Sequence, residues 1–231
     1  MSKNPHDGHR LRIRDRFRKE GCDLDHFEPH NILELVLFYC TPQKDTNQLA
    51  HLLMDEFGSL SGVLDAPCEE LMKVNGVGEY TATFLKMIPA LFRVYEQDRI
   101  KDDMILNSAA KAKNYFIPKF IGRTEKLVFV ACLDSEGKVK CCEIVNHGTV
   151  SAATVNVRKI AEYVMRYNAT NVVIAHNHPY GLAVASPEDI MTTDAIYYAL
   201  QLIGIDLTDH IIVAKDNAVS LAEIGVIKKK N

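Results

Sequence analysis

The sequence lacks the features that mark membrane-spanning, secreted and cysteine-rich metal proteins. No apolar run approaches the length of a membrane span, and the N-terminal residues MSKNPHDGHRLRIRDRF contain no apolar signal core. None of the six cysteines is spaced as Cys-x-x-Cys. We therefore expect a cytoplasmic protein with no membrane partner and with reduced thiols, two of which, Cys132 and Cys141, lie in apolar runs typical of strands.

Two familiar zinc-enzyme signatures and a strong basic charge are also absent. The chain has no HExxH motif, and it lacks the combination of HxE with PCxxC that marks zinc deaminases. Its net charge is −3, which gives no overall basic field for nucleic acid. The chain has 231 residues, of which 47% are hydrophobic and 25% charged, so it can build one large domain or two small ones.

The hydrophobic pattern changes near residue 100. Up to about Tyr95, apolar residues recur at spacings of three and four, which predicts helices. The charged stretch EQDRIKDDM is typical of a linker, and mixed strand and helix patterns follow it. We expect an α/β (α+β) protein with a helical domain over 1–96, a linker over 97–107, and a mixed sheet with flanking helices over 108–231. The predicted elements are helices over 31–40, 47–57, 80–95, 154–169 and 186–204, a hairpin over 126–145, and strands over 171–175, 210–214 and 218–222.

Two histidines, a serine and an aspartate fall within the stretch AHNHPYGLAVASPED. Strand residues alternate between faces, so His176 and His178 should leave the end of the strand on one side while Asn177 points away. Asp189 follows near the start of the next helix, where the helix dipole keeps its carboxylate ionised. Two imidazoles and one carboxylate with an open fourth position are the ligand count of a catalytic zinc site.

The same residues also have a purely structural interpretation. Ser186 and Asp189 form a capping box with Pro187 at the first helical position. A lone HxH is often a pair of surface or hydrogen-bonded histidines. The capping and metal roles are compatible, because both need Asp189 at the start of the helix.

The motif and its setting resemble a known family. HNHP, six further residues and SPED together match HxHx(7)Sx(2)D, the signature of JAMM (MPN+) metalloproteases. GTV at 148–150, NATNVVIAHNHPYG and LTDHIIVAKDNAVSLAEIG resemble the C-terminal domain of the bacterial RadC family, and the resemblance runs from about residue 10 to about residue 227. It implies a JAMM fold, related to the cytidine deaminases, with Zn²⁺ as the cofactor.

The resemblance also implies a role for each residue of the motif. The two histidines and the aspartate hold zinc in this family, and here they are His176, His178 and Asp189. The serine, here Ser186, hydrogen-bonds the tetrahedral intermediate. Zinc would polarise the scissile carbonyl and lower the pKa of a bound water to about 7. A glutamate from an early strand would then act as the general base.

The general base is where the sequence departs from the family pattern. Counting back from Leu133 places the family's acid on Lys126, and Glu125 lies one residue earlier. In a strand, an offset of one residue turns a side chain to the other face. Three alternatives follow: a bulge or slip restores Glu125, the base is Glu143 on the returning strand, or no glutamate base exists.

The N-terminal half contains a second motif. VNGVG, with Gly76 and Gly78, follows the helix pair FGSLSGVLDAPCEEL and resembles the helix-hairpin-helix that the RadC family carries here. Such a hairpin presents backbone N–H groups to DNA phosphates. A purely structural hairpin is the alternative, and it is favoured by an excess of acidic over basic residues in the first hundred positions. The only basic cluster is Arg10–Lys19, which is typical of a solvated arm.

Three functions are therefore compatible with the sequence. The first is a zinc-dependent metallopeptidase or isopeptidase that hydrolyses an amide bond in a protein or peptide substrate. The second is a DNA-associated repair or accessory protein that binds DNA weakly and without sequence preference. The third is a zinc-binding scaffold without catalysis, which the displaced glutamate makes credible.

Overall fold

The computed structural model describes residues 7–41, 46–99, 104–148 and 157–227 of the chain. The chain divides into two compact units, Met1–Leu91 and Phe92–Asn231, and each is described by itself. The domain limits expected from the sequence stay predictions. Residues 100–103 of the expected linker, and Thr149 and Val150 of GTV, lie outside the described ranges.

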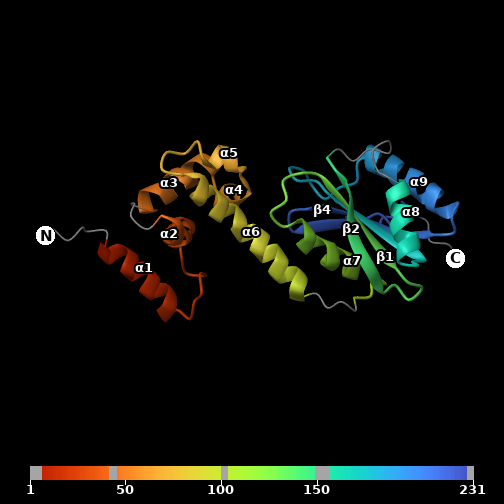
Figure 1. Ribbon diagram of the computed structural model, residues 1–231, viewed down its shortest axis with the longest axis horizontal. Helices are drawn as coiled ribbons and strands as arrows, with labels where there is room; N and C mark the ends of the chain where they lie inside the picture. The colour runs from red at the N-terminus through yellow and green to blue at the C-terminus, as the bar shows by residue number, and fades with distance from the viewer. Residues whose placement is uncertain (1–6, 42–45, 100–103, 149–156, 228–231) are drawn as a thin grey trace. The chain divides into compact units, whose positions relative to one another are not determined.

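The first unit is helical, as the sequence predicts (Figure 1). Leucines that recur at helical spacing on two of its helices, among them Leu33, Leu37, Leu49 and Leu53, pack into a single apolar core. The last helix continues beyond Leu91 into the second unit. The helices are α1 (Asp7–Lys19), α2 (Pro29–Cys40), α3 (Thr46–Phe57), α4 (Leu60–Asp65), α5 (Cys68–Leu71) and α6 (Glu79–Arg99).

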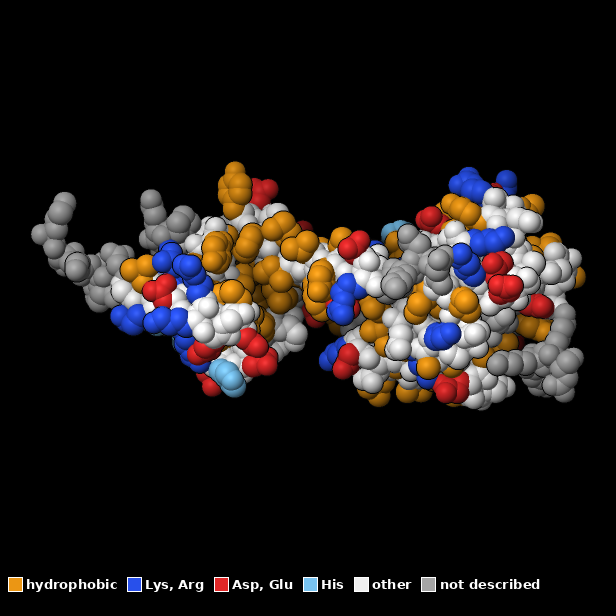
Figure 2. Space-filling model, turned by 90° about the horizontal axis from the view of Figure 1, so that it is seen from below, with side chains coloured by type: hydrophobic (Ala, Val, Ile, Leu, Met, Phe, Trp, Pro, Cys, Tyr) orange, Lys and Arg blue, Asp and Glu red, His pale blue; other side chains and the backbone are white. Residues whose placement is uncertain are grey.

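The basic run Arg10–Lys19 forms α1, and this helix packs against its neighbours instead of forming a solvated arm. Ile13 is buried in a small cluster with Phe27 and Leu35. Arg16 lies over the Phe27 ring at 4.3 Å, so part of the basic cluster serves packing. On the face of this unit drawn in Figure 2, Lys and Arg side chains lie beside Asp and Glu side chains.

The second unit contains a five-stranded mixed sheet in the order β2-β1-β3-β4-β5 (Figure 1). β1 pairs antiparallel with β2 and β3, β3 pairs parallel with β4, and β5 returns antiparallel to β4. The predicted hairpin, strands and helices of this unit are confirmed, although residues 154–156 of the first predicted helix lie outside the described ranges. The elements are α7 (Ala109–Phe116), a 3₁₀ helix (Ile117–Phe120), β1 (Leu127–Leu133), β2 (Val139–His147), α8 (Val157–Arg166), β3 (Asn171–Asn177), α9 (Pro187–Gln201), β4 (Asp206–Ala214) and β5 (Asn217–Ser220).

Helices cover both faces of this sheet. On one face, α8 and α9 pack through Ile160 and Ile196 against strand residues that include Val128 and Ile174. On the other face, α7 packs through Phe116 against the alternate strand residues. Because both faces are covered, β1 is buried along its whole length, which explains its continuous apolar sequence. None of the helices within the described ranges is both long and apolar enough to span a lipid bilayer.

Candidate metal centre

The end of β3 positions the two histidines of the motif. His176 is the next-to-last residue of β3, is fully buried and pairs with Val128 of β1. The backbone N–H of His178 donates to the Val213 carbonyl at 2.8 Å, so the β3–β4 ladder also fixes the backbone just past the strand end. Asn177 points to the other face, where its side-chain amide bonds to the backbone of Glu125 and of Leu127, the first residue of β1. The predicted alternation is therefore the geometry that the structure has.

The start of α9 positions the aspartate. Ser186 is the N-cap, Pro187 follows at the first helical position, and both hydrogen bonds of the capping box are present. The Ser186 hydroxyl donates to Asp189 Oδ2 at 2.6 Å, and the Asp189 N–H donates back to Ser186 Oγ at 3.1 Å. Burial opposes ionisation of Asp189, but the neighbouring His176 ring and the hydrogen bonds from Ser186 hold the pKa of this carboxyl far below its usual value. Asp189 is thus an anion held inside the protein.

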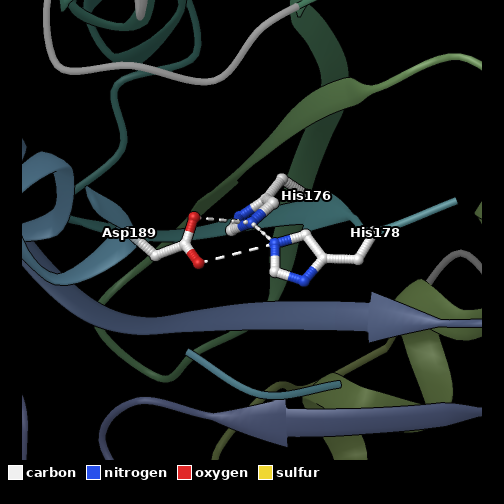
Figure 3. Close-up of side chains that lie close together, drawn as sticks. All are labelled: His176, His178 and Asp189. Atoms are coloured by element: carbon white, nitrogen blue, oxygen red, sulfur yellow. Dashed lines mark hydrogen bonds and ion pairs between the residues drawn. The ribbon is translucent and has the colours of Figure 1, made fainter. Parts of the chain in front are cut away.

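The three side chains meet in one cluster (Figure 3). His176 Nε2 lies 3.0 Å from His178 Nε2 and 3.1 Å from Asp189 Oδ1, and His178 Nε2 lies 3.4 Å from Asp189 Oδ2. The side chain of His178 is 18% exposed, whereas those of His176 and Asp189 are 1% and 5% exposed. The cluster is therefore reached from the side of His178.

The position of the His178 ring proton is compatible with a cation bound between the three residues. The Nδ1 of His178 lies 3.0 Å from the Leu182 carbonyl, which can only accept, so Nδ1 carries the proton. In the neutral ring, the lone pair of Nε2 then points toward His176 and the Asp189 carboxylate. Two imidazoles and a carboxylate are a donor set that zinc binds, and three protein ligands are the number found in catalytic zinc sites.

The predicted general base does not contact this cluster. Glu125 lies in a bend two residues before β1, and its carboxylate is 71% exposed and 3.9 Å from His147 Nδ1. Within the described residues, none of the contacts of the three clustered side chains comes from Glu125. The β1–β3 pairing begins at Val128 and is regular, whereas the β1–β2 pairing has a register shift between Val128 and Phe129. Glu125 lies before both ladders and is not brought to the histidines by either of them.

Glu143 of β2 lies on the face of the sheet that carries His176, and Lys126 lies in the chain directly before β1. Glu143 of β2 pairs with Val130, which belongs to the apolar cluster under α8 and α9. Burial lowers the pKa of His176, and the positive charge of Lys126 adds to this effect. The position that the family pattern assigns to an acid is therefore occupied by a cation.

Sequence reasoning missed two residues behind the cluster, His210 of β4 and Thr193 of α9. His176 Nδ1 lies 2.8 Å from His210 Nε2, and His210 Nδ1 lies 2.7 Å from Thr193 Oγ1. Burial, with the neighbouring His176, lowers the pKa of His210 well below its usual value, so the ring is neutral. A histidine inside the otherwise apolar run HIIVA was the available signal, because a buried polar residue in a central strand needs a partner.

The second predicted site, the glycine hairpin, lies between α5 and α6 in the first unit. Gly76 has a φ of +100°, a conformation that residues with a side chain rarely adopt. A Cβ added at Gly78 would meet no atom within 4 Å, so the backbone here is open to close approach. The local geometry is that of a tight turn between two helices.

Comparison with known proteins agrees with this architecture. The family model of the RadC-like JAB domain matches residues 106–226, which include the strands and the histidine–aspartate cluster. The chain is 34% identical to a UPF0758 protein of Fusobacterium nucleatum over 98% of this chain and 100% of that protein. It is 33% identical to a UPF0758 protein of Ruegeria pomeroyi over 95% of this chain and 97% of that protein.

These matches define the second unit as a protein domain of the RadC-like JAB class, which has a JAMM-type fold. The relatives extend the likeness over nearly the whole chain, including the helical first unit. The chain belongs to the RadC family. The names of the relatives state no activity, so the chemistry must be inferred from the site itself.

Proposed function

We propose that the protein is a zinc-dependent hydrolase of amide bonds that acts on a protein or peptide substrate in the cytoplasm. The observation that carries this proposal is the convergence of His176, His178 and Asp189, with the proton of His178 donated away from the cluster. A bound zinc ion would supply Lewis acidity and a water of lowered pKa.

The chain's own residues would give this site its rigidity and its direction of access. His176 and Asp189 are buried, and each is fixed by a regular element, β3 or the first turn of α9. His178 lies on the exposed side, where substrate would approach. Ser186 would turn its hydroxyl from the Asp189 carboxylate to the oxyanion that forms during hydrolysis.

The general base is proposed with the same alternatives that the sequence leaves open. Glu125 would have to leave its position beside His147 and turn toward the cluster. Glu143 already lies on the correct face of the sheet. If neither carboxylate serves, the domain is a zinc-binding scaffold.

The test is a hydrolysis screen with the purified full chain on a fluorogenic peptide library and on isopeptide-linked substrates. We expect turnover that a chelator abolishes and added zinc restores, and that Asp189→Asn lacks. Turnover that survives chelation and the Asp189→Asn change would contradict a zinc mechanism. Absence of turnover on all substrates, with zinc bound, would favour the scaffold.

We propose weak, sequence-independent DNA binding by the first unit as a second function. It is favoured by the tight turn at Gly76, by the open backbone at Gly78 and by the exposed arginines of α1. Backbone N–H groups at such a turn would contact phosphate, and the arginines would neutralise it.

A further inference from the structure

We propose that His210 and Thr193 are positioning residues that hold the proton of His176 on Nδ1 and so direct its Nε2 lone pair at the metal. This inference rests on the zinc site of the proposed function. It adds two residues that lie outside the HxHx(7)Sx(2)D motif and come from β4 and from the second turn of α9.

Thr193, His210 and His176 form a hydrogen-bonded chain, which we call the relay, and Thr193 determines which atoms in it donate. The Thr193 hydroxyl lies 2.6 Å from the backbone carbonyl of Asp189 and donates its single proton to it. The same hydroxyl oxygen lies 2.7 Å from His210 Nδ1. Because its proton is already committed, Thr193 Oγ1 can only accept there, and His210 Nδ1 must be the donor.

The tautomer of His210 in turn determines which nitrogen of His176 carries the proton. The His210 ring is buried, and in the part of the chain that the structure describes its two nitrogens contact only Thr193 and His176, with no carboxylate partner. An imidazolium there would be a buried charge without a counter-ion, so the ring is neutral with one proton. With that proton on Nδ1, His210 Nε2 accepts from His176 Nδ1 at 2.8 Å.

His176 is thereby left with a bare Nε2, the atom that lies 3.1 Å from Asp189 Oδ1. The opposite arrangement would be harmful to metal binding. If Thr193 donated to His210, the relay would reverse and His176 would carry its proton on Nε2, where a metal must bind. The bond from Thr193 to the Asp189 carbonyl prevents this reversal, and it ties the relay to the same residue that supplies the carboxylate.

The relay is tested directly by the ring protons of the metal-free protein. Long-range ¹H–¹⁵N NMR spectra of full-length protein labelled with ¹⁵N-histidine distinguish the two neutral tautomers. We expect the Nδ1–H tautomer at both His176 and His210. An Nε2–H tautomer at His176 in the metal-free wild type would overturn the proposal, and this reading needs neither zinc binding nor turnover, so it is independent of the proposed function.

Substitutions test the positioning role. Thr193→Val keeps the shape of the side chain but removes both hydrogen bonds, whereas Thr193→Ser keeps the hydroxyl. The matched control is Thr192→Val, because the neighbouring Thr192 is also buried but its hydroxyl has no hydrogen-bond partner among the described residues. Zinc affinity is measured by competition with a chromophoric chelator, and the fold of each variant is verified by its amide NMR spectrum.

We expect Thr193→Val to weaken zinc binding by about tenfold to hundredfold, as is usual when the partner of a metal-bound histidine is lost. It should also give mixed tautomers at His176. Thr193→Ser and Thr192→Val should retain wild-type affinity and tautomers. Equal zinc affinity in folded Thr193→Val and Thr192→Val would overturn the positioning role.

Discussion

Asn177, between the two histidines, links the metal cluster to the start of β1. Its side-chain amide donates to the Glu125 carbonyl at 2.9 Å, and its side-chain oxygen accepts from the Leu127 N–H at 2.7 Å. The side chain is buried, so water cannot replace these bonds. One residue therefore fixes the backbone on both sides of Lys126, directly opposite the end of β3.

We predict that Asn177→Ala lowers the free energy of unfolding by about 1–3 kcal/mol, because it leaves buried backbone groups without partners. The measurement is urea denaturation followed by circular dichroism. Asn107→Ala, at an exposed loop position, is the control and should change stability little. A loss in Asn177→Ala no greater than in the control would show that these two hydrogen bonds contribute nothing.

The general base is also decided at the scale of single residues. Both Glu125→Gln and Glu143→Gln keep the side-chain shape and remove the carboxylate. We predict that one of the two lowers turnover by about 10²–10⁴-fold with zinc content unchanged, as expected for loss of a general base. Steady-state kinetics on the best substrate of the library distinguish the two residues. Unchanged turnover in both variants would leave the enzyme without a glutamate base.

At the scale of elements, Ser186 connects the stability of α9 to the chemistry of the site. It caps the helix through the Asp189 N–H and also donates to the Asp189 carboxylate. We predict that Ser186→Ala costs about 1 kcal/mol of stability through the lost cap. Turnover should fall by about 10²–10³-fold if the hydroxyl also stabilises an oxyanion.

Ser108→Ala separates these two effects. Ser108 caps α7 by accepting from the Lys111 N–H, and it has no place in the metal cluster. The control should lose stability but retain turnover when both variants are assayed well below their unfolding temperatures. Equal turnover in Ser186→Ala and Ser108→Ala would reduce Ser186 to a helix cap.

Most of these elements could be predicted from local sequence patterns. The apolar run before Leu133 and the capping box at Ser186 are signals that lie within the element they define. Helix α7 was missed because it is short, with its apolar face formed by only a few residues such as Ala112 and Phe116. The sheet order could not be predicted in detail, because pairing between β1 and β3 joins residues far apart in the chain.

The same distinction explains which site residues could be predicted. His176, His178 and Asp189 share one motif in a strand, a loop and a helix start, so their convergence follows from local geometry. His210 meets His176 across 34 positions through the parallel β3–β4 pairing, which no local pattern reveals. The orientation of the Glu125 side chain could not be predicted either, because the alternation of side chains in a strand does not extend to a bend before it.

At the scale of the whole molecule, charge determines how DNA could bind. The net charge is −3, and Arg16 of the basic helix is already engaged with Glu20 at 2.9 Å. Non-specific affinity comes from phosphate neutralisation and counterion release, so few contacts give weak binding that falls steeply with salt. We predict such binding at low salt only, measured by fluorescence anisotropy on random duplex and branched DNA, and weakened by Arg12→Ala/Arg18→Ala.

The control for this prediction is Arg158→Ala/Arg166→Ala, which removes two exposed arginines from α8 in the second unit. It changes the net charge by the same amount but leaves the first unit intact. Equal weakening by both pairs would indicate a non-local charge effect. Tight binding at physiological salt that neither pair affects would contradict weak phosphate binding by α1 and would favour the repair function over the peptidase.

The zinc content of the purified full chain is the measurement that tests the central claim most directly. We expect about one zinc per chain in the wild type and none in His176→Ala/His178→Ala, since three ligands are the minimum of a stable zinc site. The matched control is His30→Ala/His51→Ala, which removes a stacked histidine pair from the first unit. Circular dichroism must show that every variant is folded. The same zinc content in wild type and in folded His176→Ala/His178→Ala would contradict the metal centre proposed at the end of β3.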